Sequence, residues 1–196
     1  MRVLVLDHGD ASTPTLVKAL EELEAECEIR PAGEILFDDI QELKPRRILL
    51  TPGPMAPEEC RIGRRVVQEL AGQIPVLGLG LGMQIIAVVA GAHLVPSKKK
   101  QGKVSETVVL RHDSRGIFEA LASPITVGRS DSPLAIEEGE ELPFLEYSAW
   151  SEEDGSVLGL RLSELGVEGL QIAPESFLTQ IGNDMLFNFL YRSQTW

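Results

Sequence analysis

The sequence lacks a hydrophobic run near the roughly 20 residues that a membrane-spanning helix needs. Its first apolar run, residues 3–6, ends at Asp7 and is too short for the hydrophobic core of a signal peptide. We therefore expect a cytoplasmic protein with no membrane contact. With 196 residues, 43% of them hydrophobic, and no internal repeat or linker, we expect residues 1–196 to form one domain.

Cysteine and basic residues are also scarce. The two cysteines, Cys27 and Cys60, lie in separate expected elements without the spacing of metal ligands, so we expect neither a disulfide framework nor a metal site. The 18 basic residues face 30 acidic ones, and the resulting net charge of −12 opposes nonspecific binding to nucleic acid. The one basic run, residues 98–100 followed by Lys103, is expected to be a solvated loop, with a partner-facing loop as the alternative.

Residues 75–84, Pro-Val-Leu-Gly-Leu-Gly-Leu-Gly-Met-Gln, form the most informative stretch. The apolar run predicts a buried parallel strand, the glycines permit a sharp turn, and an apolar helix is expected over residues 83–90. This is the organisation of a nucleophile elbow, in which a strained turn presents a reactive side chain. Here the apex of the turn is Gly80, so the elbow lacks a nucleophile.

A dinucleotide-binding loop is the competing interpretation of the same glycines. The motif G-x-G-x-x-G requires a further glycine at Met83 if it begins at Gly78, or at Ile85 if it begins at Gly80. Neither position holds one, and no phosphate-binding Lys-Ser/Thr pair follows. We therefore expect no nucleotide cofactor, and no other cofactor is indicated.

The first half of the chain alternates strands and helices, as in an open parallel sheet. We expect strands over residues 3–6, 27–30 and 47–50. One helix is expected to begin at Thr13-Pro14, and a second helix is expected over residues 61–71. Ligand sites in such sheets lie beyond the carboxyl ends of the strands. The rigid loop at residues 51–57 and the elbow should therefore face one crevice.

Shorter alternating strands are expected in the second half, over residues 104–110, 125–127, 145–150, 157–161 and 169–172. They predict an antiparallel extension of the sheet. A final helix is expected over residues 184–192, with Asn183 or Asp184 as its N-cap. The three histidines, His8, His93 and His112, are scattered and are expected in surface or turn positions.

Motifs along nearly the whole chain resemble one known family. They are Thr51-Pro52-Gly53-Pro54, residues 75–84, Gly102-Lys103-Val104-Ser105, His112-Asp113, Ile117-Phe118, Thr126-Val127, Ala149-Trp150, Gly159-Leu160-Arg161, residues 167–171, Pro174-Glu175-Ser176 and Asn188-Phe189-Leu190. Their order and spacing are similar to those of the class I glutamine amidotransferases, most closely the small glutaminase subunit of anthranilate synthase and aminodeoxychorismate synthase. The resemblance implies an α/β fold with an open, mostly parallel, flavodoxin-like mixed sheet, helices on both faces and an antiparallel extension.

The resemblance also assigns the family's catalytic positions. In active members a cysteine attacks the glutamine amide, a histidine moves the proton, and a glutamate orients the histidine. These positions fall on Gly80, Ala173 and Glu175, so only the orienting carboxylate is retained. No side chain at Gly80 or Ala173 can form a thioester or transfer a proton.

Substrate-binding positions of the family fall on Gly53, Met55, Leu81, Gln84 and Ser132 in this sequence. Met55 replaces the last glycine of the family's Pro-Gly-Pro-Gly loop, whose backbone amide approaches the substrate oxygen, and we expect it to fill part of the pocket. The family's Tyr-His-Ser-Leu segment resembles residues 130–133, which keep the serine and introduce a proline. We therefore do not expect glutamine recognition of the family's kind, and Gln84 is expected to serve mainly as a helix residue.

The segment after the first strand also departs from the family. Members typically have Asp-Asn-Tyr-Asp-Ser-Phe-Thr near the face that meets the synthase subunit, whereas this chain has Asp-His-Gly-Asp-Ala-Ser-Thr at residues 7–13. The bulky aromatic side chains are absent. The docking surface is therefore either rebuilt for another partner or without one.

Two functional hypotheses follow. The first is a catalytically inactive homologue of the glutaminase subunit, kept as a binding, structural or regulatory subunit of a chorismate-using synthase or another protein. The alternative is an active hydrolase of the same fold that uses Glu175, Asp131 and Ser132. Deliberate replacement of two catalytic residues is a third explanation, but the changes at Met55 and Pro133 count against it.

Overall fold

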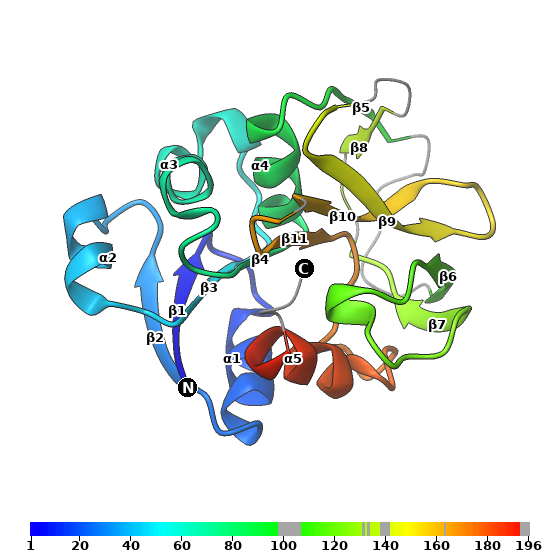
Figure 1. The fold of residues 1–196 in the computed structure, drawn as a ribbon, viewed down its shortest axis with the longest axis horizontal. Coiled ribbons are helices and arrows are strands. Elements are labelled where there is room, and N and C mark those ends of the chain that lie inside the picture. Colours follow the sequence, from blue (N-terminus) through cyan, green and yellow to red (C-terminus); the bar gives the residue numbers. More distant parts are fainter. Residues whose placement is uncertain (98–106, 131, 133, 138–141, 163, 193–196) are drawn as a thin grey trace.

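The computed structural model describes residues 1–97, 107–130, 132, 134–137, 142–162 and 164–192. A central mixed sheet carries helices on both of its faces (Figure 1). The strands are β1 (Arg2–Asp7), β2 (Glu26–Pro31), β3 (Arg47–Leu50), β4 (Val76–Leu79), β5 (Leu94–Pro96), β6 (Thr107–His112), β7 (Ile125–Gly128), β8 (Leu134–Ile136), β9 (Leu145–Ser151), β10 (Val157–Leu162) and β11 (Val167–Leu170). The helices are α1 (Thr13–Glu22), α2 (Phe37–Leu43), α3 (Arg61–Leu70), α4 (Leu81–Val89) and α5 (Gly182–Tyr191), with single 3₁₀ turns at η1 (Pro57–Glu59) and η2 (Gly116–Phe118).

The sheet has two halves. In its strand order, β2-β1-β3-β4-β11-β10-β9-β6-β7, neighbours pair in parallel from β2 to β11 and antiparallel from β11 to β7. The strands β3 and β4 are buried along their whole length, as expected for parallel strands covered on both faces. The predicted α/β fold, with a parallel block and an antiparallel extension, is confirmed.

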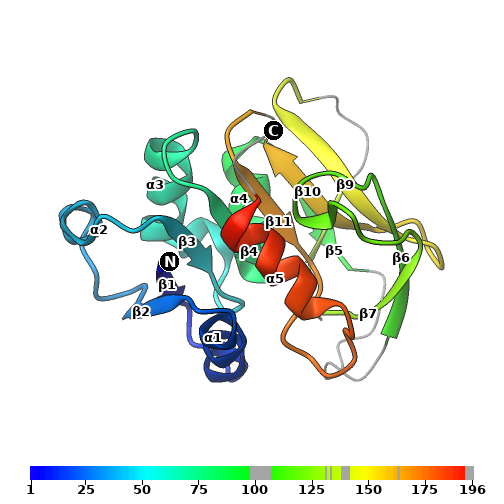
Figure 2. The same cartoon turned by 60° about the horizontal axis from the view of Figure 1, so that its bottom comes forward.

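Alternation along the strands distributes the core between two layers. In β1, Val3 and Val5 contact the layer that contains α1 and α5, whereas Leu4 and Leu6 contact the layer that contains α2, α3 and α4. Figure 2 shows α1 and α5 together on one side of the sheet, and α3 and α4 on the other. Each face of the parallel block is thus closed by apolar helix surfaces.

The observed elements differ from the sequence prediction at several helices. The sequence pattern missed α2, whose buried face consists of only Phe37 and Ile40, too few positions to give a helical period. The helix α4 begins at Leu81, directly after the turn, and not at Met83. The expected caps of α5 are wrong, since its N-cap is Ile181, which makes no side-chain capping hydrogen bond.

A buried ion-pair network joins the antiparallel half to η2. The guanidinium of Arg161 is fully buried, with Nη1 2.8 Å from Asp113 Oδ2 and Nε 3.5 Å from Glu168 Oε1. The backbone N–H of Ile117 also donates to the Glu168 carboxylate, at 3.0 Å and 3.2 Å. These contacts satisfy charges that would be costly to bury alone.

Within the described residues, no helix is both long enough and apolar enough to cross a membrane.

Candidate functional site

The turn between β4 and α4 is built as the sequence predicted. Gly80 lies between the two elements with φ 54° and ψ −109°, a backbone conformation that strongly favours glycine. Its N–H donates to Leu170 O at 2.9 Å, and its carbonyl accepts from Gln84 N at 3.2 Å. A Cβ at this apex would lie 3.1 Å from Pro52 Cβ and 3.1 Å from Ser130 Oγ. A side chain at this apex would therefore be both strained and closely surrounded.

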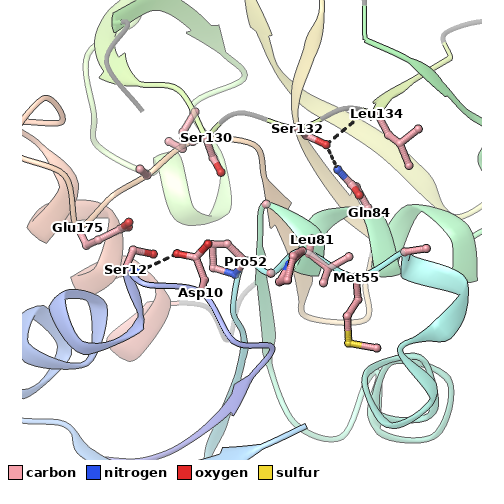
Figure 3. A pocket seen from close by; sticks show the side chains of 16 residues that line it. Asp10, Ser12, Pro52, Met55, Leu81, Gln84, Ser130, Ser132, Leu134 and Glu175 are labelled. Carbon is pink, nitrogen blue, oxygen red and sulfur yellow. Dashed lines mark hydrogen bonds between the residues drawn. The ribbon is translucent and has the colours of Figure 1, made fainter. Parts of the chain in front are cut away.

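A crevice of about 500 Å³ opens at the apex. Five stretches of chain line it: the segment after β1, the loop after β3, the elbow, the segment that follows β7 and the segment that follows β11 (Figure 3). The lining residues are Asp10, Ser12, Pro52, Gly53, Pro54, Met55, Ala56, Gly80, Leu81, Gln84, Ser130, Ser132, Leu134, Ile172, Ala173 and Glu175. The prediction that the Pro-Gly-Pro loop and the elbow share one crevice is confirmed.

Glu175 and Ala173 lie in the crevice wall that follows β11. Burial raises the pKa of the Glu175 carboxyl, its own N–H and the Ser12 hydroxyl oppose that increase, and Asp10 adds to it. Its Oε2 is buried without a hydrogen-bond partner among the described residues. Ala173 is nearly fully buried; its N–H donates to Gly128 O, and its carbonyl accepts from Ser176 N and from the Thr179 hydroxyl. Among the described residues that line the crevice, the carboxylate therefore has no basic side chain to face.

The sequence did not indicate Asp10 and Ser12 as part of this wall. Ser12 N donates to Asp10 Oδ1 at 2.8 Å, and Figure 3 shows both side chains beside Glu175. The strand β1 lies inside the parallel block, so its carboxyl end opens on the same edge as the elbow. The strand order could therefore have indicated these two residues. It places the segment at residues 7–13, which departs from the family, in the crevice as well as on the surface.

Gln84 and Ser132 form the opposite wall. Gln84 Nε2 donates to Ser132 Oγ, which also accepts from Leu134 N at 3.1 Å. The amide of Gln84 is thus held by a neighbouring residue of the crevice. Asp131, the third polar candidate from the sequence, lies outside the described residues.

Gly53 and Met55, both in the loop after β3, differ in how closely they are packed. A Cβ at Gly53 would lie 2.6 Å from both Cβ and O of His8, so only glycine fits the close approach of the two segments. Met55 lines the crevice and is 45% exposed, and partial filling of the family's pocket by this side chain stays a prediction.

The expectation for two histidines was wrong. His8 is 5% exposed, because the loop after β3 covers it, and burial lowers its pKa. His112 is also buried, in a stacked contact with Phe118. Neither lines the crevice among the residues described.

The cysteines are outside the crevice as well. Burial raises the pKa of both the Cys27 and the Cys60 thiol to about 11, which leaves little reactive thiolate at neutral pH. Among described residues, no group of three or more histidine, cysteine or acidic side chains is arranged to hold a metal ion.

Comparison with known proteins identifies the scaffold. The sequence family "Glutamine amidotransferase class-I" matches residues 4–193 of this chain. The chain belongs to the class I glutamine amidotransferase family. Its elbow and its Pro-Gly-Pro loop both lie within the region that matches the family indicated by the sequence motifs.

Relatives within the class I glutamine amidotransferases match nearly end to end. Anthranilate synthase component 2 of Pseudomonas aeruginosa is 38% identical over 193 residues, covering 96% of this chain and 94% of that protein. Aminodeoxychorismate synthase component 2 of Escherichia coli is 35% identical over 192 residues, covering 97% and 100%. The similarity to the glutaminase subunits of these synthases, predicted from motifs, is confirmed at the level of the family and its component 2 members.

Solved structures agree with this fold. A Thermoplasma acidophilum protein described as a GMP synthase subunit superposes with a TM-score of 0.80 at 26% identity, covering 97% of this chain and 92% of that one. A glutamine amidotransferase of Thermotoga maritima gives a TM-score of 0.78 at 16% identity, covering 98% and 97%, which supports the fold alone.

Proposed function

We propose that this chain is a catalytically inactive homologue of the component 2 glutaminase subunits and has a non-catalytic role in a synthase complex. One observation carries the proposal: the elbow keeps its turn and its crevice, but the apex is Gly80. The base position implied by the family motif is Ala173, in the same crevice. The scaffold is retained without the side chains that perform the chemistry.

Amide hydrolysis through a thioester needs a nucleophile and a group that moves its proton. The described crevice lining offers hydroxyls, carboxylates and one primary amide, but no cysteine, histidine or lysine. Glu175 retains a position suited to orienting a base, but no base lies beside it in the described lining. We therefore infer that glutamine is not hydrolysed in this crevice.

A working enzyme built from Glu175, Asp131 and Ser132 is the weaker candidate. The Ser132 hydroxyl accepts hydrogen bonds from Gln84 and from Leu134, and neither of these partners can act as a base. Figure 3 shows Ser132 and Glu175 on opposite walls of the crevice. This separation disfavours the Glu175 carboxylate as a direct base for Ser132.

The partner in this proposal is a chorismate-using synthase chain that takes free ammonia. The support is the nearly full-length similarity to proteins named component 2 of anthranilate synthase and of aminodeoxychorismate synthase. A component 2 scaffold without glutaminase chemistry would contribute assembly, stability or regulation to such a synthase. The expected location of both chains is the cytoplasm.

The test uses the purified full chain with a chorismate-using synthase chain from the same organism. We expect a stable complex in size-exclusion chromatography, synthase activity with ammonium salts, and no activity with glutamine. Ammonia release from glutamine should stay at the level of the buffer blank. A component 2 relative with an intact cysteine serves as the positive control for the assay.

Two results would overturn the proposal. Ammonia release above the blank that is abolished in Glu175→Gln would show that the chain is an active glutaminase. Absence of any complex with each candidate synthase chain would remove the proposed role in a complex while leaving the loss of activity in place.

A further inference from the structure

His8 is a buried titratable residue that the proposed function does not use. It follows β1, and it stands where members of the family typically have an asparagine. Its N–H donates to the Thr51 hydroxyl oxygen at 2.9 Å, and a Cβ added at Gly53 would lie 2.6 Å from both its Cβ and its carbonyl oxygen. The loop after β3 therefore lies directly against His8, which is only 5% exposed.

The imidazole ring of His8 has no contact that would stabilise a charge on it. Neither Nδ1 nor Nε2 has a hydrogen-bond partner among the described residues. A Cβ at Gly63 in α3 would lie 3.4 Å from Nε2 and 3.1 Å from Ile85 Cδ1 in α4, so the ring lies beside the buried faces of these two helices. Protonation would add a charge and a second N–H donor, and both would be buried without a partner.

The charges around His8 do not compensate for its burial. Burial lowers the pKa of His8, although Asp7 and the backbone groups of Thr51 and Leu6 oppose this decrease. Within the described part of the chain, no carboxylate forms an ion pair with His8. The loop at residues 51–57 and α4 contain no titratable side chain. The other titratable groups on the neighbouring elements are Arg2 in β1, Asp10 after it, Glu58 and Glu59 in η1, Cys60, and Arg61, Arg64, Arg65 and Glu69 in α3.

His112 shows how the same fold holds a buried imidazole with partners. Its Nδ1 accepts from Ser114 N at 3.1 Å, its Nε2 lies 2.7 Å from Ala122 O, and its ring stacks on Phe118. Both ring nitrogens of His112 are thus used by the fold. His8 is buried without such contacts, so its neutral form depends on the loop that covers it.

The loop at residues 51–57 is the part of these surroundings that can move most readily. Its residues 54–56 are exposed, whereas β1 and the facing sides of α3 and α4 belong to the packed core. Residues 52–56 of this loop also line the crevice. A single segment therefore contacts His8 and forms a wall of the crevice.

We propose that His8 is a pH-sensitive switch: its neutral ring packs beneath the loop at residues 51–57, and its protonation displaces that loop and with it a wall of the crevice. An open loop exposes a ring of ordinary pKa, so acidification below 6.5 favours the open form. No step of the switch uses Gly80 or Ala173, so it does not depend on the proposed loss of catalysis.

The methionines of the full chain provide the readout, because Met55 lies in the loop whereas Met83 and Met185 are buried in the core. The test is an NMR titration of the chain with isotope-labelled methionine methyl groups, from about pH 7.5 to about pH 4.5. The Met55 signal is assigned with Met55→Leu. We expect the Met55 signal to shift in one step with a midpoint below 6.5, while the signals of Met83 and Met185 stay unchanged.

Two neutral variants and one control connect this step to His8. His8→Asn introduces the residue typical of the family and should abolish the step, and His8→Gln is the second variant should the first fold poorly. The control His93→Asn removes an exposed histidine and should leave the step unchanged. The ring signals of His8 in the unmodified chain should titrate with the same midpoint as Met55, a comparison that needs no variant.

Five results overturn the proposal. The Met55 signal does not change with pH, or the signals of Met55, Met83 and Met185 change together, as in acid unfolding. The step persists in a folded His8 variant, or it is lost in His93→Asn. The ring of His8 and the Met55 methyl group titrate with different midpoints.

Discussion

Glu168 and Glu175 are two carboxylates with raised pKa values in very different surroundings. Burial raises the pKa of Glu168 against the opposing effect of Arg161, and its oxygens are contacted by Arg161 and by the Ile117 N–H. Burial also raises the pKa of Glu175, but its Oε2 has no hydrogen-bond partner among the described residues. One carboxylate is fully integrated into the fold, and the other faces a crevice.

The two surroundings point to different reasons for retaining a buried acid. Glu168 ties β11 to β10 and to η2, so its loss would disturb several elements. Glu175 makes no comparable tie, so packing alone gives little reason for a carboxylate there. An orienting residue that has lost the base beside it would look like this, which fits the proposal of a lapsed active site.

The strongest test of this contrast is Arg161→Met. Removing the cation leaves the Glu168 carboxylate buried without its partner, and we expect the free energy of unfolding to fall by about 3–5 kcal/mol. Urea denaturation measures the change. The double variant Arg161→Met/Glu168→Gln should recover part of the loss, and equal stability of the single and double variants would contradict the coupling.

The next largest effect is expected for Gly80→Cys. A side chain at φ 54° is strained and would crowd Pro52 and Ser130, so we expect a loss of about 1–3 kcal/mol without any glutaminase activity. Thermal and urea denaturation measure the stability. The matched control is Gly33→Cys, where an added Cβ meets no atom within 4 Å and a change below about 0.5 kcal/mol is expected.

Two outcomes would argue against this account of the elbow. A melting temperature of Gly80→Cys equal to or above that of the unmodified chain would contradict the strain. Recovered glutaminase activity in that variant would show that Ala173 and Met55 do not disable the site independently.

The smallest effect is expected for Glu175→Gln, and it depends on pH. A carboxyl pKa raised by folding gives a contribution to stability that is complete below the ordinary value of 4.5 and is lost as pH rises through the folded value. The Gln variant lacks this loss, so its stability relative to the unmodified chain should increase above pH 4.5. Denaturation at several pH values measures the difference, and a difference that does not change with pH would contradict it.

The sequence predicted the features that rest on short-range chemistry. Glycines at the elbow, the apolar runs of β3 and β4, and the order of the family motifs were sufficient for the sheet, the crevice and the missing apex side chain. The helix α2 was missed because Phe37 and Ile40 give too short an apolar pattern, and the helix depends on packing against the rest of its layer.

Features that require distant segments could not be predicted in this way. The burial of His8 depends on the loop after β3 folding over the end of β1, and the place of Asp10 and Ser12 in the crevice depends on strand order.

The contact between Gly53 and His8 has a consequence for how such chains are classified. Any side chain at residue 53 would collide with the backbone of the segment that follows β1, whether or not the protein has a reaction to perform. Packing therefore requires the glycine of the Pro-Gly-Pro loop, and this glycine would persist after catalysis is lost. A search that sorts sequences into working and lapsed glutaminases should give this glycine no weight and should rely on the residues at the apex and the base position.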